Sequence, residues 1–304
     1  MRILVCGANG FVGRHLVESL KPSGYEVVAT GIDLSLAPEL EEYVDEYYGD
    51  CDLTSPESVS GLPLDTVDAI INLAGLAQVG SSFGSEKKYN AVNVSVHTTV
   101  ADELLRQDLT SVRVVAISTG AVYDSHQPMP LTEESDLLQK GSPYALSKIA
   151  MESALEEHRE KGLDIVVARP FNHIGPGQLP GFLVPDLVQQ LRKSDSIIAG
   201  DLSTERDYTD VRDVVKAYVL LATIPLLQHQ VYNVCSGTST SGQTMLDELA
   251  NAFGKESIKV EIDQSRIRPN DPKKIFGSNE KLCQDTGWQP SIPLNQTIKD
   301  IVKE

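Results

Sequence analysis

Cysteine, tryptophan and long apolar runs are scarce in this chain of 304 residues. Its 4 cysteines lie far apart without paired spacing, which excludes a disulfide framework and a zinc motif built on closely spaced cysteines. The longest apolar stretch, from Tyr218 to Leu227, is too short to span a bilayer and predicts a packed helix. No signal-peptide pattern opens the sequence. We therefore expect a soluble, cytoplasmic protein without a metal site.

Positive charge is also scarce, because 43 acidic residues face 26 basic ones and give a formal net charge of −17. Nucleic-acid binding requires clustered lysines and arginines, so this composition argues against a nucleic-acid partner. The same charge repels anionic ligands at long range, so local cations must dominate any site that binds a phosphate. The hydrophobic content of 41% suffices for one large two-lobed globule, and we find no linker or internal repeat.

The chain opens with an apolar run, Arg2–Cys6, followed by three glycines spaced at Gly7, Gly10 and Gly13 and by a helical pattern that reaches Leu20. Strand, glycine turn and helix therefore follow in that order. The glycines permit close approach of the backbone to a pyrophosphate, whose charge a helix N-terminus favours. An ordinary glycine-rich turn would use the same residues, but the order of elements favours dinucleotide binding.

The rest of the chain alternates short apolar runs with helical patterns, which predicts a parallel sheet with crossover helices. Strands are expected at Arg2–Cys6, Glu26–Thr30, Ala69–Asn72, Val112–Ile117, Asp164–Ala168 and Val231–Val234. Helices are expected at Phe11–Leu20, Tyr89–Arg106 and Ser142–Lys161. Ser142 and Pro143 are typical N-cap and first-turn residues, whereas the acidic run from Glu39 to Glu46 is interpreted as a solvated face.

Tyr144 and Lys148 lie four residues apart and therefore on one face of the predicted helix. A free tyrosine has a pKa of about 10, and a nearby ammonium lowers it by stabilising the phenolate. A surface helix would give the same spacing by chance. Thr119, which follows the predicted strand Val112–Ile117, stands at the sheet edge where ligands of such folds bind, although turns also favour hydroxyl residues there.

Four motifs together resemble the extended short-chain dehydrogenase/reductase family: Gly7-x-x-Gly10-x-x-Gly13, Asn72-Leu73-Ala74-Gly75, Ser118-Thr119 and Tyr144-x-x-x-Lys148. The resemblance spans nearly the whole chain. It implies an α/β fold, a Rossmann doubly wound parallel sheet with a smaller, mostly C-terminal substrate-binding lobe. The Rossmann domain would cover residues 1–170 with returning segments near 207–235. The substrate lobe would comprise mainly 171–206 and 236–304.

The resemblance also implies roles for individual positions. The catalytic residues would be Thr119, Tyr144 and Lys148. The cofactor, NAD(H) or NADP(H), would contact Gly7, Asn9, Gly10, Phe11, Val12, Gly13, Asp33, Asp52, Leu53, Leu73, Ala74, Gly75, Tyr144 and Lys148. A nucleotide-diphosphate sugar would contact Thr119, Asn172, Val184, Arg206 and Arg268. Either arginine could instead be a surface ion-pair partner, and Asp52 could be a plain turn residue.

The stretch from Arg169 to Gln178 resembles the branch of the family that acts on GDP-mannose derivatives, and later segments are similar to its bacterial 4-keto-6-deoxy-sugar reductases. A 4,6-dehydratase would need a carboxylate two residues after the catalytic hydroxyl. That position is Ala121, which cannot act as a base. Reduction of a GDP-linked 4-keto sugar is therefore expected, with 4-epimerisation as the alternative. Retention of all three catalytic residues argues against an inactive, cofactor-binding regulator.

Two further expectations concern the cofactor and the assembly. Asp33 follows the second strand, where it could bind the adenosine 2′-hydroxyl and repel a 2′-phosphate, so NADH is slightly favoured over NADPH. The helices Tyr89–Arg106 and Ser142–Lys161 match those that form a dimeric four-helix interface in the family, which implies a homodimer. His173 is either a structural turn residue or a pocket residue.

Overall fold

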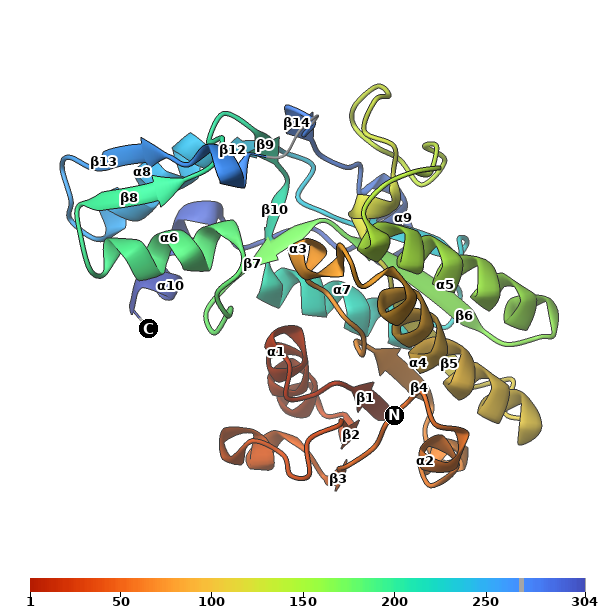
Figure 1. Ribbon diagram of the computed structural model, residues 1–304. Helices are drawn as coiled ribbons and strands as arrows, with labels where there is room; N and C mark the ends of the chain where they lie inside the picture. Colours follow the sequence, from red (N-terminus) through yellow and green to blue (C-terminus); the bar gives the residue numbers. More distant parts are fainter. Residues whose placement is uncertain (268–270, 304) are drawn as a thin grey trace.

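A computed structural model describes residues 1–267 and 271–303 of the chain (Figure 1). Seven parallel strands form its main sheet in the order β11-β6-β5-β4-β1-β2-β3. Their bounds are β1 Arg2–Cys6, β2 Glu26–Thr30, β3 Glu46–Tyr48, β4 Ala69–Asn72, β5 Arg113–Ile117, β6 Ile165–Pro170 and β11 Val231–Val234. The order reverses between β1 and β4, and ligands of such sheets bind at the carboxyl ends beside that switch point.

The predicted strands are confirmed with small shifts at two of them. β5 begins one residue later than expected, and β6 runs from Ile165 to Pro170 rather than from Asp164 to Ala168. The sequence did not predict β3, because its residues Glu46–Tyr48 continue the acidic run that we interpreted as a solvated face. An edge strand buries little side-chain area, so polar residues are compatible with it.

Helices cover both faces of the sheet. Alternate residues of β1 point into the apolar core on one face and the apolar core on the other. Ile3 and Val5 pack with α1 (Phe11–Leu20), α7 (Val211–Thr223) and α9 (Glu280–Thr286). Leu4 and Cys6 pack with α2 (Pro56–Ser60), α4 (Glu86–Arg106) and α5 (Pro143–Glu160). Successive side chains of a strand point to opposite faces, so an apolar run of this kind is buried on both sides.

A smaller lobe with its own apolar core lies at the upper left of Figure 1, beyond the end of β6. Its helices are α6 (Leu183–Leu191), α8 (Gly242–Ala252) and α10 (Leu294–Lys303), and the short α3 (Val79–Ser82) belongs to the loop after β4. Its strand sets are β7 (Asn172–Ile174) with β10 (Tyr208–Asp210), β8 (Ser196–Ala199) with β13 (Lys259–Ile262), and β12 (Thr240–Ser241), β9 (Glu205–Arg206) and β14 (Lys274–Ile275). Strands of two to four residues carry too few positions to show a period, and the sequence analysis predicted none of these.

The predicted start of α5 is confirmed: Ser142 Oγ accepts a hydrogen bond from Ala145 N at 3.2 Å, and Pro143 is the first helical residue. This N-cap fixes the position of the first helical turn at the sheet edge. α4 begins at Glu86, three residues before the predicted start. None of the helices in the described ranges is both long and apolar enough to cross a membrane.

Candidate active site

Thr119 and Tyr144 lie together at the carboxyl end of β5. Thr119 caps the short helical turn that follows the strand, and its Oγ1 accepts a hydrogen bond from Ala121 N at 3.2 Å. Tyr144 lies in the first turn of α5, within hydrogen-bonding reach of Thr119. Both residues are 9% exposed. The two hydroxyls are therefore nearly desolvated and face the same small region.

Burial raises the pKa of Tyr144 above its ordinary value, and the hydrogen bond with Thr119 acts in the opposite direction. The sequence-based expectation of a lowered pKa for Tyr144 is therefore wrong for the structure, because desolvation dominates. Lys148 donates from Nζ to the main-chain oxygen of Ile117 at 2.7 Å. The phenol consequently stays protonated at neutral pH, which suits a proton donor better than a base.

Lys148 is buried, and desolvation lowers its pKa to about 8, with the opposing attraction of Glu152 as the next cause. Glu152 lies one helical turn further along α5 and forms a buried ion pair with Arg169, whose Nη2 is 2.6 Å from Oε2. Ser118, the neighbour of Thr119, donates its hydroxyl hydrogen bond to Glu152. The negative charge that faces the lysine is therefore held in place by Ser118, directly after β5, and by Arg169 of β6.

Asn93 of α4 ties the loop after β4 to α5, a role that the sequence analysis missed. Its Nδ2 donates to Ser147 Oγ at 2.9 Å, and its Oδ1 accepts from Leu76 N at 2.7 Å. A Cβ on Gly75, whose φ is +146°, would stand 2.9 Å from Asn93 Oδ1 and 3.6 Å from Lys148 Nζ. An asparagine inside a helical pattern gives no local signal for such a contact.

The glycine loop fits a dinucleotide. Gly7 has φ +87°, and a Cβ on Gly13 would stand 2.2 Å from the oxygen of Gly7, so neither position tolerates another residue without a backbone shift. Gly10 is the N-cap of α1 and supplies no side-chain cap, and the first turn carries no acidic residue. The first N–H groups of the helix are therefore available to a phosphate.

Asn9 holds the predicted ribose-binding segment beside this loop. Its Nδ2 donates to Asp33 Oδ2 at 2.9 Å and to the oxygen of Ser35 at 3.1 Å. Asp33 itself is exposed after β2. Asp52 adopts the turn role, because its Oδ1 accepts hydrogen bonds from the N and Oγ1 of Thr54 at 2.9 and 2.8 Å. Leu53 is buried in the core beneath the sheet.

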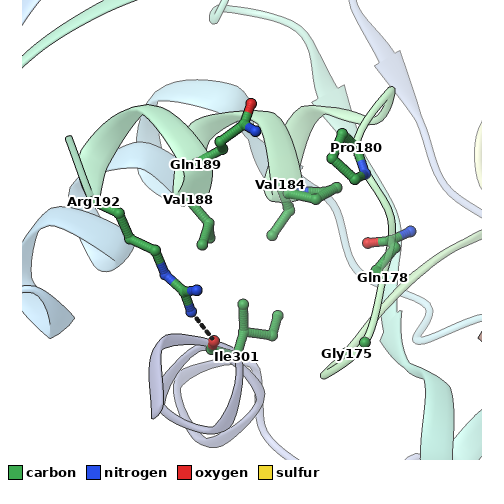
Figure 2. A pocket seen from close by; sticks show the side chains of 10 residues that line it. Gly175, Gln178, Pro180, Val184, Val188, Gln189, Arg192 and Ile301 are labelled. Carbon is green, nitrogen blue, oxygen red and sulfur yellow. Dashed lines mark hydrogen bonds between the residues drawn. The ribbon is translucent and has the colours of Figure 1, made fainter. Parts of the chain in front are cut away.

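The predicted substrate residues are distributed more widely. Asn172 is exposed on β7, and Arg206 on β9 forms an ion pair with Asp271, with Nη2 2.9 Å from Oδ1. Val184 is buried on α6, where it lines a cavity that includes none of the catalytic residues (Figure 2). The predicted Arg268 lies outside the described residues. The described structure thus brings Thr119, Tyr144 and Lys148 together but does not gather these side chains around them.

His173 connects the smaller lobe to the glycine loop. Its Nδ1 donates to the oxygen of Phe171 at 3.1 Å, and its ring stacks on that of Phe11 with centroids 6.1 Å apart and planes 9° apart. Burial lowers its pKa, so the imidazole is neutral at physiological pH. His173 therefore bonds within its own turn and also lies against a residue of the predicted cofactor site.

Comparison with known proteins agrees with this geometry. Residues 3–235 match the sequence profile of the NAD dependent epimerase/dehydratase family. A GDP-6-deoxy-D-mannose reductase of Pseudomonas aeruginosa is 30% identical over 316 positions, which cover 100% of this chain and 96% of that protein.

Two solved structures share the fold over nearly the whole chain. RMD from Pseudomonas aeruginosa, complexed with NADPH, superposes with a TM-score of 0.85 at 29% identity and covers 99% of this chain and 97% of its own. A UDP-glucose 4-epimerase from Thermus thermophilus, in complex with NAD, gives a TM-score of 0.86 at 27% identity and covers 100% of this chain and 98% of its own.

Proposed function

The chain belongs to the NAD-dependent epimerase/dehydratase family, and we propose that within it the protein reduces the 4-ketone of a GDP-linked 4-keto-6-deoxy-hexose. The main support is that Thr119, Tyr144 and Lys148 converge at the end of β5. Ala121, at the position where a dehydratase needs a base, has no ionisable group. The similarity to a GDP-6-deoxy-D-mannose reductase supports the same reaction.

When bound, NAD(P)H would supply the hydride that reduces the ketone carbon. Tyr144, kept protonated by burial, donates its proton to the ketone oxygen. The O–H of Thr119, which bonds Tyr144 in the free protein, turns to the same oxygen and orients the ketone. With a pKa of about 8, Lys148 is mostly cationic at neutral pH and stabilises the phenolate that remains on Tyr144.

Three roles extend this proposal to cofactor and substrate binding. The glycine loop between Gly7 and Gly13 would hold the phosphates of the cofactor, and Asp33 would hold the adenosine ribose and favour NADH. Arg206 and Arg268 contact the diphosphate of the sugar nucleotide, with Asn172 and Val184 beside it. Arg206 would have to exchange its partner Asp271 for the ligand, because both anions compete for one guanidinium.

We also propose a domain boundary at residue 170 and a homodimeric assembly. Of the apolar residues on the two candidate interface helices, Val96, Val100, Leu104 and Leu155 are buried in the chain's own core. Val92 and Ile149 are only partly buried and remain available to a partner. A homodimer should appear in sedimentation velocity at micromolar concentration, and a lone monomer peak there would remove that proposal.

The reaction is tested by incubating the protein with GDP-, UDP- and dTDP-sugars and their 4-keto forms, with NADH or NADPH, followed by product NMR. We expect stoichiometric consumption of reduced cofactor with a GDP-4-keto-6-deoxy-hexose and no 4-keto product from GDP-mannose. Interconversion of 4-hydroxy epimers without added cofactor would identify an epimerase instead. Dehydration of GDP-mannose would contradict the argument from Ala121.

A further inference from the structure

A cavity of about 290 Å³ lies between α6, α10 and the loop that precedes α6 (Figure 2). Its middle is apolar and is walled by Val184, Val188 and Ile301. Small-molecule sites in proteins have this character, with apolar walls and a few placed polar groups, and this volume is at the small end of their range. The polar groups at its two ends, from Gln178 and Arg192, indicate what it could bind.

At one end stands the side-chain amide of Gln178. Its Nε2 donates to the oxygen of His173 at 3.1 Å, which fixes the orientation of the amide. Its Oε1 is buried and has no hydrogen-bond partner among the described residues. Figure 2 shows this oxygen on the side of the amide that faces Val184 and the cavity. A buried carbonyl oxygen without a donor is unfavourable, so a ligand that donates a hydrogen bond there would relieve the cost.

At the other end stands the guanidinium of Arg192. Its Nη2 donates a long hydrogen bond, 3.4 Å, to the oxygen of Ile301. No carboxylate of the described residues lies within 4.0 Å of Arg192, whereas every other arginine in residues 1–267 forms such an ion pair. In a chain with a net charge of −17, this guanidinium stands out as a cation available to an anionic ligand.

We propose that this cavity is a binding site for a small amphipathic carboxylate. The carboxylate pairs with Arg192, an apolar or aromatic body lies against Val184 and Val188, and a hydroxyl at the far end donates to Gln178 Oε1. Val184 and Arg192 are separated by about 12 Å along the helix axis, and a helical side chain leans toward the N-terminus. The ligand must therefore be elongated, with its polar groups at opposite ends.

The site is separate from the reacting groups. Neither Thr119, Tyr144 nor Lys148 lines the cavity. The opposite side of α6 faces β8, where Gln190 Oε1 accepts a hydrogen bond from Ile198 N at 2.7 Å. Residues four apart share one helix face, so Val184, Val188 and Arg192 form a stripe distinct from the one that carries Gln190.

The proposal is tested by titrating 3-(4-hydroxyphenyl)propanoate into the full chain by isothermal titration calorimetry. We expect saturable one-site binding with a Kd below about 1 mM. Tyramine, which replaces the anion with a cation, should not bind, and 3-(4-methoxyphenyl)propanoate, which lacks the donor, should bind at least about fivefold more weakly.

Arg192→Gln should weaken binding at least about tenfold, and Gln178→Met about fivefold. Arg266→Gln is the matched control, because Arg266 is a surface arginine of the same lobe that already pairs with Asp263, and it should bind the probe like the parent protein. Thermal unfolding of each variant verifies the fold. Absence of saturation up to about 10 mM, equal binding of tyramine, or unchanged affinity in Arg192→Gln would each overturn the proposal.

Discussion

Lys148 Nζ donates a hydrogen bond to the main-chain oxygen of Ile117 at 2.7 Å, so the ammonium is fixed to the end of β5. That bond places the cation at the end of the strand that Thr119 follows. The negative charge of Glu152 raises the pKa of Lys148 and so opposes the effect of its burial. The position of the charge, rather than the helical spacing of Tyr144 and Lys148 alone, therefore decides the electrostatics of the site.

The charge of Lys148 should make turnover depend on pH. Because burial lowers the pKa of Lys148 to about 8, the ammonium is lost as pH rises through that value, and kcat should fall on that limb. Glu152→Gln removes a charge that raises this pKa, so the limb should move to lower pH by up to about one unit. Glu156→Gln, an exposed neighbour on α5, is the control and should leave the limb in place. An unmoved limb in Glu152→Gln would contradict the assignment.

Tyr144→Phe should lower turnover by about a hundredfold to ten-thousandfold, because the phenol is the proton donor. Binding of cofactor and sugar nucleotide should remain, since the ring is retained. Tyr25→Phe, which removes a remote hydroxyl beside the core, is the control and should keep the parent rate. Steady-state kinetics and ligand titration check both; more than half of the parent rate in Tyr144→Phe would refute the role.

Asp33→Asn should shift cofactor preference toward NADPH by at least about fivefold, because a carboxylate near the 2′-phosphate costs at least about 1 kcal/mol. The amide oxygen can still accept the bond from Asn9 Nδ2, which is 2.9 Å from Asp33 Oδ2 in the parent protein, so the loop should keep its conformation. Fluorescence titration with both cofactors measures the ratio. An unchanged ratio would mean that Asp33 does not face the ribose.

Arg206→Ala should weaken sugar-nucleotide binding by about 1.5 to 3 kcal/mol, the range for hydrogen bonds to charged groups, and the same is predicted for Arg268→Ala. The affinity of both variants for the free cofactor should equal that of the parent protein. Arg266→Ala is the control, since Arg266 pairs with Asp263 on the surface. Calorimetric titration with a GDP-sugar distinguishes the variants, and equal affinity in Arg206→Ala and the parent protein would exclude the phosphate contact.

His97→Leu should raise the free energy of unfolding by about 1 kcal/mol, because both ring nitrogens of His97 are buried without a partner among the described residues. His158→Leu should lower it by about 1 to 3 kcal/mol, since the ring nitrogens of His158 bond Ala154 O and Asp102 Oδ1, each at 2.9 Å. Urea unfolding of both variants measures the difference. The reverse order of stability would contradict the interpretation of His97 as unsatisfied.

Local sequence determined the elements that carry the candidate site. The apolar run at Arg2–Cys6 and the glycines that follow it required a strand and a tight turn, and the structure has both at the predicted residues. The N-cap Ser142 fixed where α5 begins, and so the turn on which Tyr144 lies. Periodicity, capping and glycine sterics act over a few neighbouring residues, so one sequence reveals them.

Tertiary structure alone decided what surrounds those residues. Whether the pKa of Tyr144 rises or falls depends on burial and on where Lys148 points, and the partner of Lys148 comes from a strand thirty-one residues earlier in the sequence. The contact of Asn93 with Ser147, and the cavity that joins Gln178 to Arg192, likewise bring together separate segments. Desolvation and long-range hydrogen bonds depend on the packed chain, because no local pattern encodes which distant atoms exclude water from a side chain.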